Sequence, residues 1–408
     1  MRLGKITRQK PFFRMDTNKL RVLILLLLPF RWVSAQPGPC GGAQSGTIAC
    51  LLPNVAASLF AQSGSQASPN IPTGDAILVT PLVATQPIPS PASGFVYTYD
   101  ASAGVYVRSS QSLGPILSER AETIGRKKLF IGYTFQRIVF DKVDGTGIHV
   151  LYAGVPLPVS NGVITEKVNV SLQLNQSTFF ATYGVSNRID LSLAVPYATV
   201  YMADVINAVF TPNQSTGPGM PEFAEGSHTA RGLGDINIQG KGTVLHSDTA
   251  ALAVGSTLRL PTGNDYEALG TGTIGFKPFI AGSISYKKIH PHLDLGYLLN
   301  GKSVLSGNIL TGDKRQLPDQ FLYSLGVDAS ATKRLTLAVD LLGAEVIHGD
   351  RVGDQGFYRK SYNMTNASTG FKVNIAGHLL LVANLLFRLN DSGARANIVP
   401  LVGVSYAF

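Results

Sequence analysis

Charged and polar side chains occupy every second position along several otherwise apolar segments of the chain, and they are the first candidates for chemistry. In an extended strand, successive side chains point to opposite faces, so each such segment has one polar and one apolar face. Where the apolar face meets lipid, an Arg or Lys on it near the midplane would cost about 2–4 kcal/mol, so the charges should point into an interior lumen. We expect these residues to line that lumen: Asp190, Asp235, Lys241, Arg259, Lys277, Asp294, Asp328, Arg334 and Asp340.

These charges support two interpretations, because both signs are present. Around an aqueous path they would form solvated pairs or a ring that selects ions. Alternatively, they form an internal salt-bridge network that fixes the barrel shape and blocks flow. A barrel of about twelve strands is only modestly wider than one of eight strands, whose interior is filled by side chains. An open path predicts that neutralising Asp235 and Asp340 changes conductance and ion selectivity.

An enzyme is the main alternative for these polar residues, and an outer-membrane hydrolase would need a nucleophile beside an oriented histidine. His228 follows Ser227, and His348 lies near Asp350, but neighbours in sequence do not make a catalytic dyad. No nucleophile motif surrounds either pair. We therefore expect no enzymatic activity.

Three short motifs resemble ligand sites but favour structural roles. His290-Pro291-His292 has no third ligand nearby, so it predicts a solvated tight turn rather than a metal site. Residues 232–235 (Gly-Leu-Gly-Asp) and 260–264 (Leu-Pro-Thr-Gly-Asn) lack the Gly-Lys-Ser/Thr of a phosphate loop. Their glycines permit bends and close backbone approach, and Pro-Thr-Gly-Asn favours a turn. We expect no metal and no cofactor.

The elements that must position these side chains are about twelve antiparallel strands, with a margin of two. Leu335, Leu337 and Val339 share one face of a segment whose other face holds Arg334 and Asp340, and this alternation is typical of a half-buried strand. Of the predicted strands, 166–185 and 361–376 are the least regular. The strands are predicted near residues 128–140, 166–185, 189–203, 231–246, 249–261, 273–288, 292–304, 318–331, 334–347, 361–376, 378–389 and 396–408.

The predicted connections alternate between short and long. Short periplasmic turns and long external loops are the arrangement of outer-membrane β-barrels, and closing the sheet leaves no edge in the bilayer. The tight connections are residues 186–188, 247–248, 289–291, 332–333 and 377. The long ones are residues 141–165, 204–230, 263–272, 305–317 and 348–360.

Both ends of the chain carry signals for export and assembly. Residues 1–35 have the basic flank, apolar core and small-x-small ending of a cleavable signal peptide, and either Met1 or Met15 is a suitable start. This segment carries eight basic residues and one acidic residue, so it holds most of the formal net charge of +9, and we expect no nucleic-acid partner. The chain ends in an alternating strand closed by Phe408, which resembles the signal recognised by the barrel assembly machinery.

Residues 36–117 differ from the rest because Ser, Ala, Pro, Gln and Gly dominate them. Such a composition buries too little surface to fold alone, which favours a periplasmic leader, while a plug that enters the barrel is the alternative. One hairpin is predicted within it, near residues 94–108. An oxidising periplasm favours a disulfide between Cys40 and Cys50. Lipidation of Cys40 is disfavoured by the preceding Pro39.

Several segments resemble a family of outer-membrane transporters assigned to the meta-cleavage pathway of phenol degradation. They are residues 188–197, 232–235, 259–264 and 269–272, and the resemblance covers roughly residues 118–408. The resemblance implies an outer-membrane barrel, loosely similar to hydrophobic-compound transporters of the fatty-acid type. The expected preference for hydrophobic solutes comes from this resemblance alone.

Together these features predict an all-β chain. Residues 1–35 are a signal peptide, 36–117 a leader or plug, and 118–408 a transmembrane β-barrel in the outer membrane of a Gram-negative cell. Only 14% of residues are charged, yet no apolar run beyond the signal segment approaches the roughly 20 residues of a membrane helix. The expected role is passive uptake of small hydrophobic or aromatic solutes. The alternative is a closed structural or adhesion barrel whose external loops bind a partner.

Overall fold

The computed structural model describes Cys40 and residues 44–62, 97–100, 105–108, 112–159, 162–213, 219–353 and 356–408. The predicted signal peptide, with its alternative start at Met15, lies outside these ranges, as does most of the predicted leader. Within the described ranges, no helix has both the length and the apolar character needed to cross a membrane.

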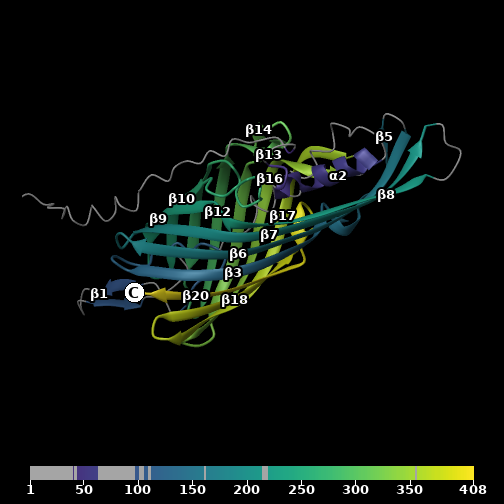
Figure 1. The fold of residues 1–408 in the computed structure, drawn as a ribbon. Helices are drawn as coiled ribbons and strands as arrows, with labels where there is room; N and C mark the ends of the chain where they lie inside the picture. Colours follow the sequence, from purple (N-terminus) through teal and green to yellow (C-terminus); the bar gives the residue numbers. More distant parts are fainter. Residues whose placement is uncertain are drawn as a thin grey trace, which may run out of the picture. The chain divides into compact units, whose positions relative to one another are not determined.

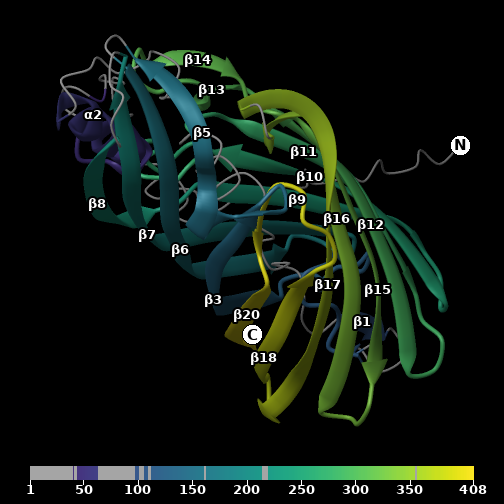
Figure 2. The same cartoon turned by 90° about the vertical axis from the view of Figure 1, so that its right-hand side faces the viewer.

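Twelve strands close into an antiparallel barrel (Figures 1 and 2), which confirms the predicted fold class. Closure is made by β3 (Leu129–Val143), which pairs with β6 (Gly162–Gly184) on one side and β20 (Ile398–Ala407) on the other. The strands between them, in sheet order, are β7 (Ile189–Pro212), β9 (Ile236–His246), β10 (Ala250–Leu260), β11 (Gly275–Ile284), β12 (Ile289–Asn300), β15 (Gln320–Ser330), β16 (Leu335–Gly353), β17 (Gly356–Ala376) and β18 (Leu379–Arg388).

Several shorter strands and helices do not belong to the twelve strands of the barrel. The predicted hairpin is confirmed as β1 (Tyr97–Asp100) paired with β2 (Val105–Arg108). Residues expected to form long loops contain β4 (Thr146–Gly147), η2 (Ile148–Val150), β5 (Leu151–Val159), β8 (Met220–Leu233), β13 (Lys302–Asn308) and β14 (Asp313–Gln316). The last connection holds β19 (Ala394–Ala396), and the amino-terminal region folds as η1 (Ile48–Cys50) and α2 (Leu51–Gln62).

The outer surface near the tight turns is an apolar band. On β7, Leu191 is 51% exposed, and on β16, Val339 is 58% exposed, although both are large aliphatic side chains. Water would not favour such exposure, whereas a bilayer requires an outward-facing apolar band about 25 Å tall. The protein is therefore a transmembrane barrel of the outer-membrane type. We call the two ends of the barrel the short-turn end and the long-loop end.

Farther toward the long-loop end, the polarity of the two faces reverses. At about 3.3 Å per residue, the 23 residues of β6 span about 76 Å, whereas a tilted membrane strand needs only about 9–11 residues. Beyond the apolar band the outward side chains of β6 are polar and the inward ones apolar. The outward set is Lys167, Asn169, Ser171, Gln173 and Asn175, and the inward set is Val168, Val170, Leu172 and Leu174. This reversal explains why the second predicted strand was irregular.

The same reversal corrects two predicted loops. Residues 204–230 were expected to be a long loop, but β7 continues to Pro212 and pairs with β8. Residues 348–360 were expected to be another, but β16 and β17 pair as far as Gly353 and Gly356. These segments lie beyond the apolar band, where the outer face need not be uniformly apolar. On β7 the outward side chains there alternate between apolar Val205 and Val209 and polar Asn207 and Thr211, so the pattern of a membrane strand is lost. Figure 1 shows β6 and β7 running on toward β5 and β8.

One tight turn is also displaced from its predicted place. The turn expected at residues 289–291 lies instead at residues 285–288, where Lys287 adopts a positive φ of 56°. Ile289 pairs with Ala329, so His290 and Pro291 belong to β12. Proline is tolerated there because the position is near the beginning of the strand.

The band predicts that position along a strand decides the cost of an outward charge. Leu193→Arg on β7 places a guanidinium in the band and should lower the free energy of unfolding in liposomes by about 2–4 kcal/mol. Ser171→Arg, outward on β6 beyond the band, should change it by less than about 0.5 kcal/mol. Denaturant titration of both variants provides the measurement. Equal costs at the two positions would contradict the assigned band.

Candidate functional site

An irregular segment, residues 112–125, crosses the interior of the barrel near its short-turn end. Every residue in it is buried except Glu122, which is half-buried. A buried segment outside a sheet must find other partners for its backbone N–H and C=O groups. Here those partners are side chains on the inner face of the barrel wall. We call residues 112–125 the internal segment.

Four wall carboxylates accept hydrogen bonds from the internal segment. Asp340 on β16 accepts from the Ser118 hydroxyl at 3.0 Å, and Asp190 on β7 accepts from the Ile124 N–H at 3.0 Å. Asp294 on β12 accepts from the backbone N–H of Glu119 at 3.4 Å, and Asp328 on β15 accepts from the Ser112 hydroxyl. Asp294, Asp328 and Asp340 lie on three neighbouring strands, whereas Asp190 lies on β7, six strands from β16 in the barrel, so together they hold the segment across the lumen.

Two wall lysines also bind the segment, each from a strand paired with one that carries an anchoring carboxylate. The Lys241 ammonium on β9 lies 3.3 Å from the Glu119 carboxylate and donates to the Arg120 carbonyl at 2.8 Å. Lys372 on β17 donates to the carbonyls of Leu113, at 3.3 Å, and Pro115. The side chain of Lys241 is 1% exposed, so water does not screen its pairing with Glu119.

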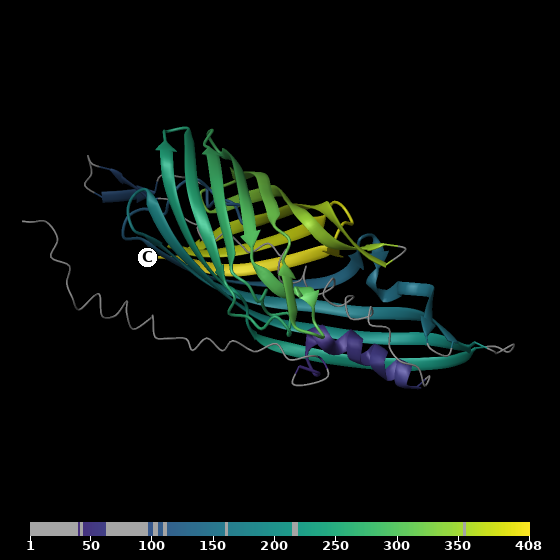
Figure 3. The same cartoon turned by 90° about the horizontal axis from the view of Figure 1, so that it is seen from above.

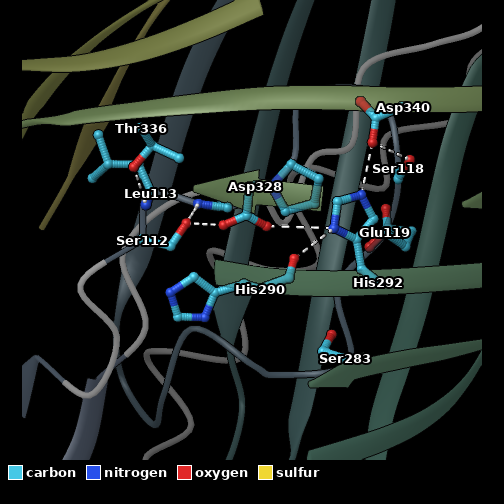
Figure 4. A network of polar contacts seen from close by, with 12 residues as sticks. Ser112, Leu113, Ser118, Glu119, Ser283, His290, His292, Asp328, Thr336 and Asp340 are labelled. Carbon is cyan, nitrogen blue, oxygen red and sulfur yellow. Dashed lines mark hydrogen bonds and ion pairs between the residues drawn. The ribbon is translucent and has the colours of Figure 1, made fainter. Parts of the chain in front are cut away.

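His292 links two of these carboxylates on the wall itself (Figure 4). Its Nε2 lies 2.7 Å from Asp340 and its Nδ1 lies 3.4 Å from Asp328, with the imidazole buried. Asp340 also accepts from Ser118, and Asp328 from Ser112, so one histidine joins two anchoring points of the internal segment. A small cavity lined by Ser112, His292 and their neighbours lies at this interface.

The nine predicted lumen residues fall into several places. Asp190, Lys241, Asp294, Asp328 and Asp340 contact the internal segment. Asp235 and Arg259 face each other near the long-loop end, with 3.7 Å between Nε and Oδ2. Lys277 is half-buried, with its ammonium 5.3 Å from the Phe279 ring centre. Arg334 is exposed in the turn that precedes β16, away from this network.

Three partners in this network escaped the sequence prediction. His292 was expected in a solvated turn, and this was wrong, because β12 begins at Ile289 and turns His292 to the same inner face as Asp294. Lys372 belongs to a strand whose alternation was weak. The residues around Glu119 show no periodic pattern. Only its negative charge, next in sequence to a barrel whose interior carries charges of both signs, could have suggested that it pairs with the wall.

Asp235 joins the segments that carry the family resemblance. Its carboxylate accepts from the backbone N–H of Thr271 at 2.8 Å and from that of Gly263 at 3.1 Å. A Cβ on Gly270 would lie 2.4 Å from Asp235 Oδ1, so the close approach requires glycine. The N–H of Gly234 donates to the Pro196 carbonyl at 2.8 Å, bringing in the remaining segment. These motifs therefore fold the loop after β10 onto the barrel wall.

Two of the other residues that were considered for catalysis have ion-pair partners outside this network. The His228 ring lies 3.0 Å from Glu267, and Asp350 pairs with Arg359 at 2.6 Å. Within the described residues, no group of three or more His, Cys, Asp or Glu side chains could hold a metal ion. Phe408 donates its N–H to the Leu129 carbonyl at 2.7 Å and stacks edge-on against Tyr406. Recognition of this end by the assembly machinery stays a prediction.

The Cys40–Cys50 disulfide is present at the opposite, long-loop end. The two cysteines pack with Tyr266, Val304 and Ile309 in one apolar cluster. The N–H of Ala49 donates to the Tyr266 carbonyl at 2.9 Å. This packing and this hydrogen bond attach the disulfide-linked amino-terminal region to the loop after β10 and to the β13–β14 hairpin.

Comparison with known proteins shows similarity in architecture only. No protein-family model and no curated protein matches the chain. Among solved structures, the toluene transporter TbuX of Ralstonia pickettii is 10% identical, with 71% of this chain and 92% of that chain covered and a TM-score of 0.38. The NanC porin is 9% identical over 68% and 98%, with a TM-score of 0.37. A Pseudomonas aeruginosa FadL homologue is 9% identical over 69% and 88%, with a TM-score of 0.32.

The contacts predict that Glu119 anchors the internal segment. Glu119→Gln would leave the buried Lys241 ammonium without its carboxylate, and breaking such a pair costs about 3–5 kcal/mol. Asp190 lies across from Lys241 in the sheet and offsets part of this cost, so we expect about 3 kcal/mol. Amide hydrogen exchange of residues 112–125 should report the loss as reduced protection.

The matched control is Asp391→Asn, which removes the carboxylate that pairs with Lys142 and, at 3.3 Å, with Arg388. The pair with Lys142 is 33% and 44% exposed, so its loss should cost less than about 1 kcal/mol and leave residues 112–125 protected. Unchanged protection in Glu119→Gln would show that the buried pair does not hold the segment.

Proposed function

We propose that the protein is an outer-membrane channel for passive uptake of small hydrophobic or aromatic solutes, and that the internal segment is its plug. The observation that carries this proposal is how the segment is held. Residues 112–125 fill the short-turn end through side-chain hydrogen bonds and ion pairs, and they add no strand to the barrel. Such contacts can exchange for water, so the segment can leave while the barrel stays closed on itself.

Support for hydrophobic solutes comes from the inner wall, which was expected to be polar throughout. Toward the long-loop end it carries an apolar stripe of residues on β3, β6 and β7, which we call the inner stripe: Ile138, Phe140, Val168, Val170, Leu172, Leu174, Val200, Met202 and Ile206. Ile116 and Leu117 of the internal segment belong to the same apolar cluster. Displacing the plug would uncover one end of this stripe, which suits solutes that bind apolar surface.

A charge reversal in the plug provides the test. Glu119→Lys places an ammonium beside Lys241 in a buried site, so like-charge repulsion should expel the segment. We expect single-channel conductance in planar bilayers to appear or rise at least tenfold over the original protein. The double variant Glu119→Lys with Lys241→Glu restores opposite charges at this pair and should lower conductance again. The return is expected to be partial, because the new carboxylate faces Asp190 and cannot donate to the Arg120 carbonyl. Glu225→Lys, exposed on the outer face of β8, is the control.

Solute preference can then be ranked on the Glu119→Lys channel. Aromatic and aliphatic solutes should block the current at lower concentration than sugars of similar size. If the bilayer stays sealed although hydrogen exchange shows the segment released, the channel proposal fails. Conductance without preference for apolar solutes would retain a channel and remove the proposed solute class.

A closed barrel that binds an external partner is the second candidate. It is favoured by β6, which continues beyond the apolar band and presents polar side chains such as Lys167, Asn169 and Gln173 outward. This candidate predicts a sealed bilayer for every variant above.

A further inference from the structure

The helix α2 lies on the inner face of the sheet where β7 and β8 extend beyond the apolar band. In Figure 3, the purple helix follows the teal ribbons of these strands. Leu52, Val55, Ala56 and Leu59 are buried in the same cluster as the inner stripe. A helix of 12 residues is marginal in water by itself, so α2 depends on this contact to stay folded.

Gly226 on β8 marks the place where the helix comes closest. A Cβ built on Gly226 would lie 2.7 Å from Val55 Cγ2 and 3.1 Å from Leu51 Cδ1. The absence of a side chain there lets α2 rest against the strand backbone. Residues directly opposite each other on paired strands point to the same side, and the residue opposite Gly226 on β7 is Asp204.

Asp204 is an unusual residue for this place. It is 0% exposed, and neither carboxylate oxygen has a hydrogen-bond partner. Its neighbours along the inner face of β7 are Met202 and Ile206, and its partner on β6 is Val170. An ionised carboxylate without partners in such apolar surroundings is strongly disfavoured, whereas the neutral acid is tolerated.

The charged groups on the described elements around Asp204 do not offset the cost of a negative charge on its carboxyl group. The helix α2, with the sequence LLPNVAASLFAQ, contains no titratable side chain. On β6 the same face carries another acid, Glu166, and on β8 it carries Glu222 and His228. His228 is paired with Glu267 at 3.0 Å.

We propose that Asp204 makes the binding of α2 to β7 and β8 depend on pH. The helix covers the carboxyl group of Asp204, and only the neutral, protonated form of that group tolerates being covered. When the carboxylate ionises, it gains hydration only if the helix leaves. Protonation therefore holds α2 in place, and ionisation releases it. This inference concerns the long-loop end and stands whether or not the barrel conducts.

The direction and range of the pH dependence follow from linkage. Burial raises the pKa of Asp204 from 3.8 to about 7 while the helix is bound, and release returns it to the ordinary value near 3.9. Below about pH 4 both states hold the proton, so binding is strongest. Between about pH 4 and 7 only the bound state holds it, so binding weakens by up to tenfold per pH unit. Above about pH 7 the dependence levels off.

The test is hydrogen exchange of the full chain, refolded in detergent micelles, at pH 5 and pH 7. Protection factors of the α2 amides, corrected for the intrinsic rate at each pH, should fall roughly 50-fold between these values. The amides of β15 report the barrel itself and should keep their protection. In Asp204→Asn, which cannot ionise, the protection of α2 should not depend on pH.

Further variants separate this effect from its neighbours. Burial also raises the pKa of Glu166 to about 7, so Glu166→Gln tests whether that acid contributes instead. His228→Gln tests the pair with Glu267. Asp204→Leu serves if the asparagine variant does not fold, and Glu225→Gln on the outer face is the matched control. A flat profile in the original protein overturns the proposal. So does an unchanged pH dependence in Asp204→Asn or Asp204→Leu.

Discussion

The exclusion of charge from the lipid-facing surface is the constraint on which the rest of this structure depends. The strands must turn their Asp, Lys and His side chains inward, because a charge in the apolar band is costly. The interior of a twelve-stranded barrel is narrow, so these groups come to lie near one another in a space with little water. Buried charges must then find partners. The internal segment provides them with backbone N–H and C=O groups, hydroxyls and one carboxylate.

The internal segment therefore needs no regular secondary structure. Its backbone donors and acceptors are satisfied by the wall, as when Asp190 accepts from Ile124 and Lys372 donates to Leu113. Gly114 adopts a φ of 76°, and a Cβ there would collide with the Arg120 guanidinium. Because glycine has no Cβ and tolerates this φ, the chain can turn tightly inside the lumen. The wall and the segment thus depend on each other: without the segment, the wall charges would require water.

The thickness of the bilayer imposes a second arrangement along the strands. Only part of β6 and β7 faces lipid. Beyond that part, both strands turn apolar side chains inward, and β6 presents polar side chains to solvent. The inner stripe would be exposed to water if nothing covered it, and α2 with its disulfide-linked neighbours covers part of it. The interactions at the two ends of the barrel therefore differ. Polar contacts hold the internal segment at the short-turn end, whereas apolar packing holds α2 at the long-loop end.

The sequence by itself determined the barrel, because an outward apolar band imposes a two-residue period that can be seen in each strand. The strand positions, most of the tight turns and the inward direction of Asp190, Asp328 and Asp340 follow from that period. It also singled out Cys40 and Cys50, which the structure joins. Whether residues 36–117 act as a leader or a plug could not be decided from composition.

The tertiary structure alone decided the features in segments where the two-residue alternation of apolar and polar side chains breaks down or is absent. The extensions of β7 and β16 have left the lipid, so their outer faces need not be apolar and they resemble loops in sequence. His292 changed from a turn residue to a buried link between Asp328 and Asp340 through a shift of a few residues in one turn. Glu119 and Lys241 are 122 positions apart, and no local pattern relates them. Their pairing arises only when the barrel closes around the segment, because closure brings distant charges together in a space where neither can stay alone.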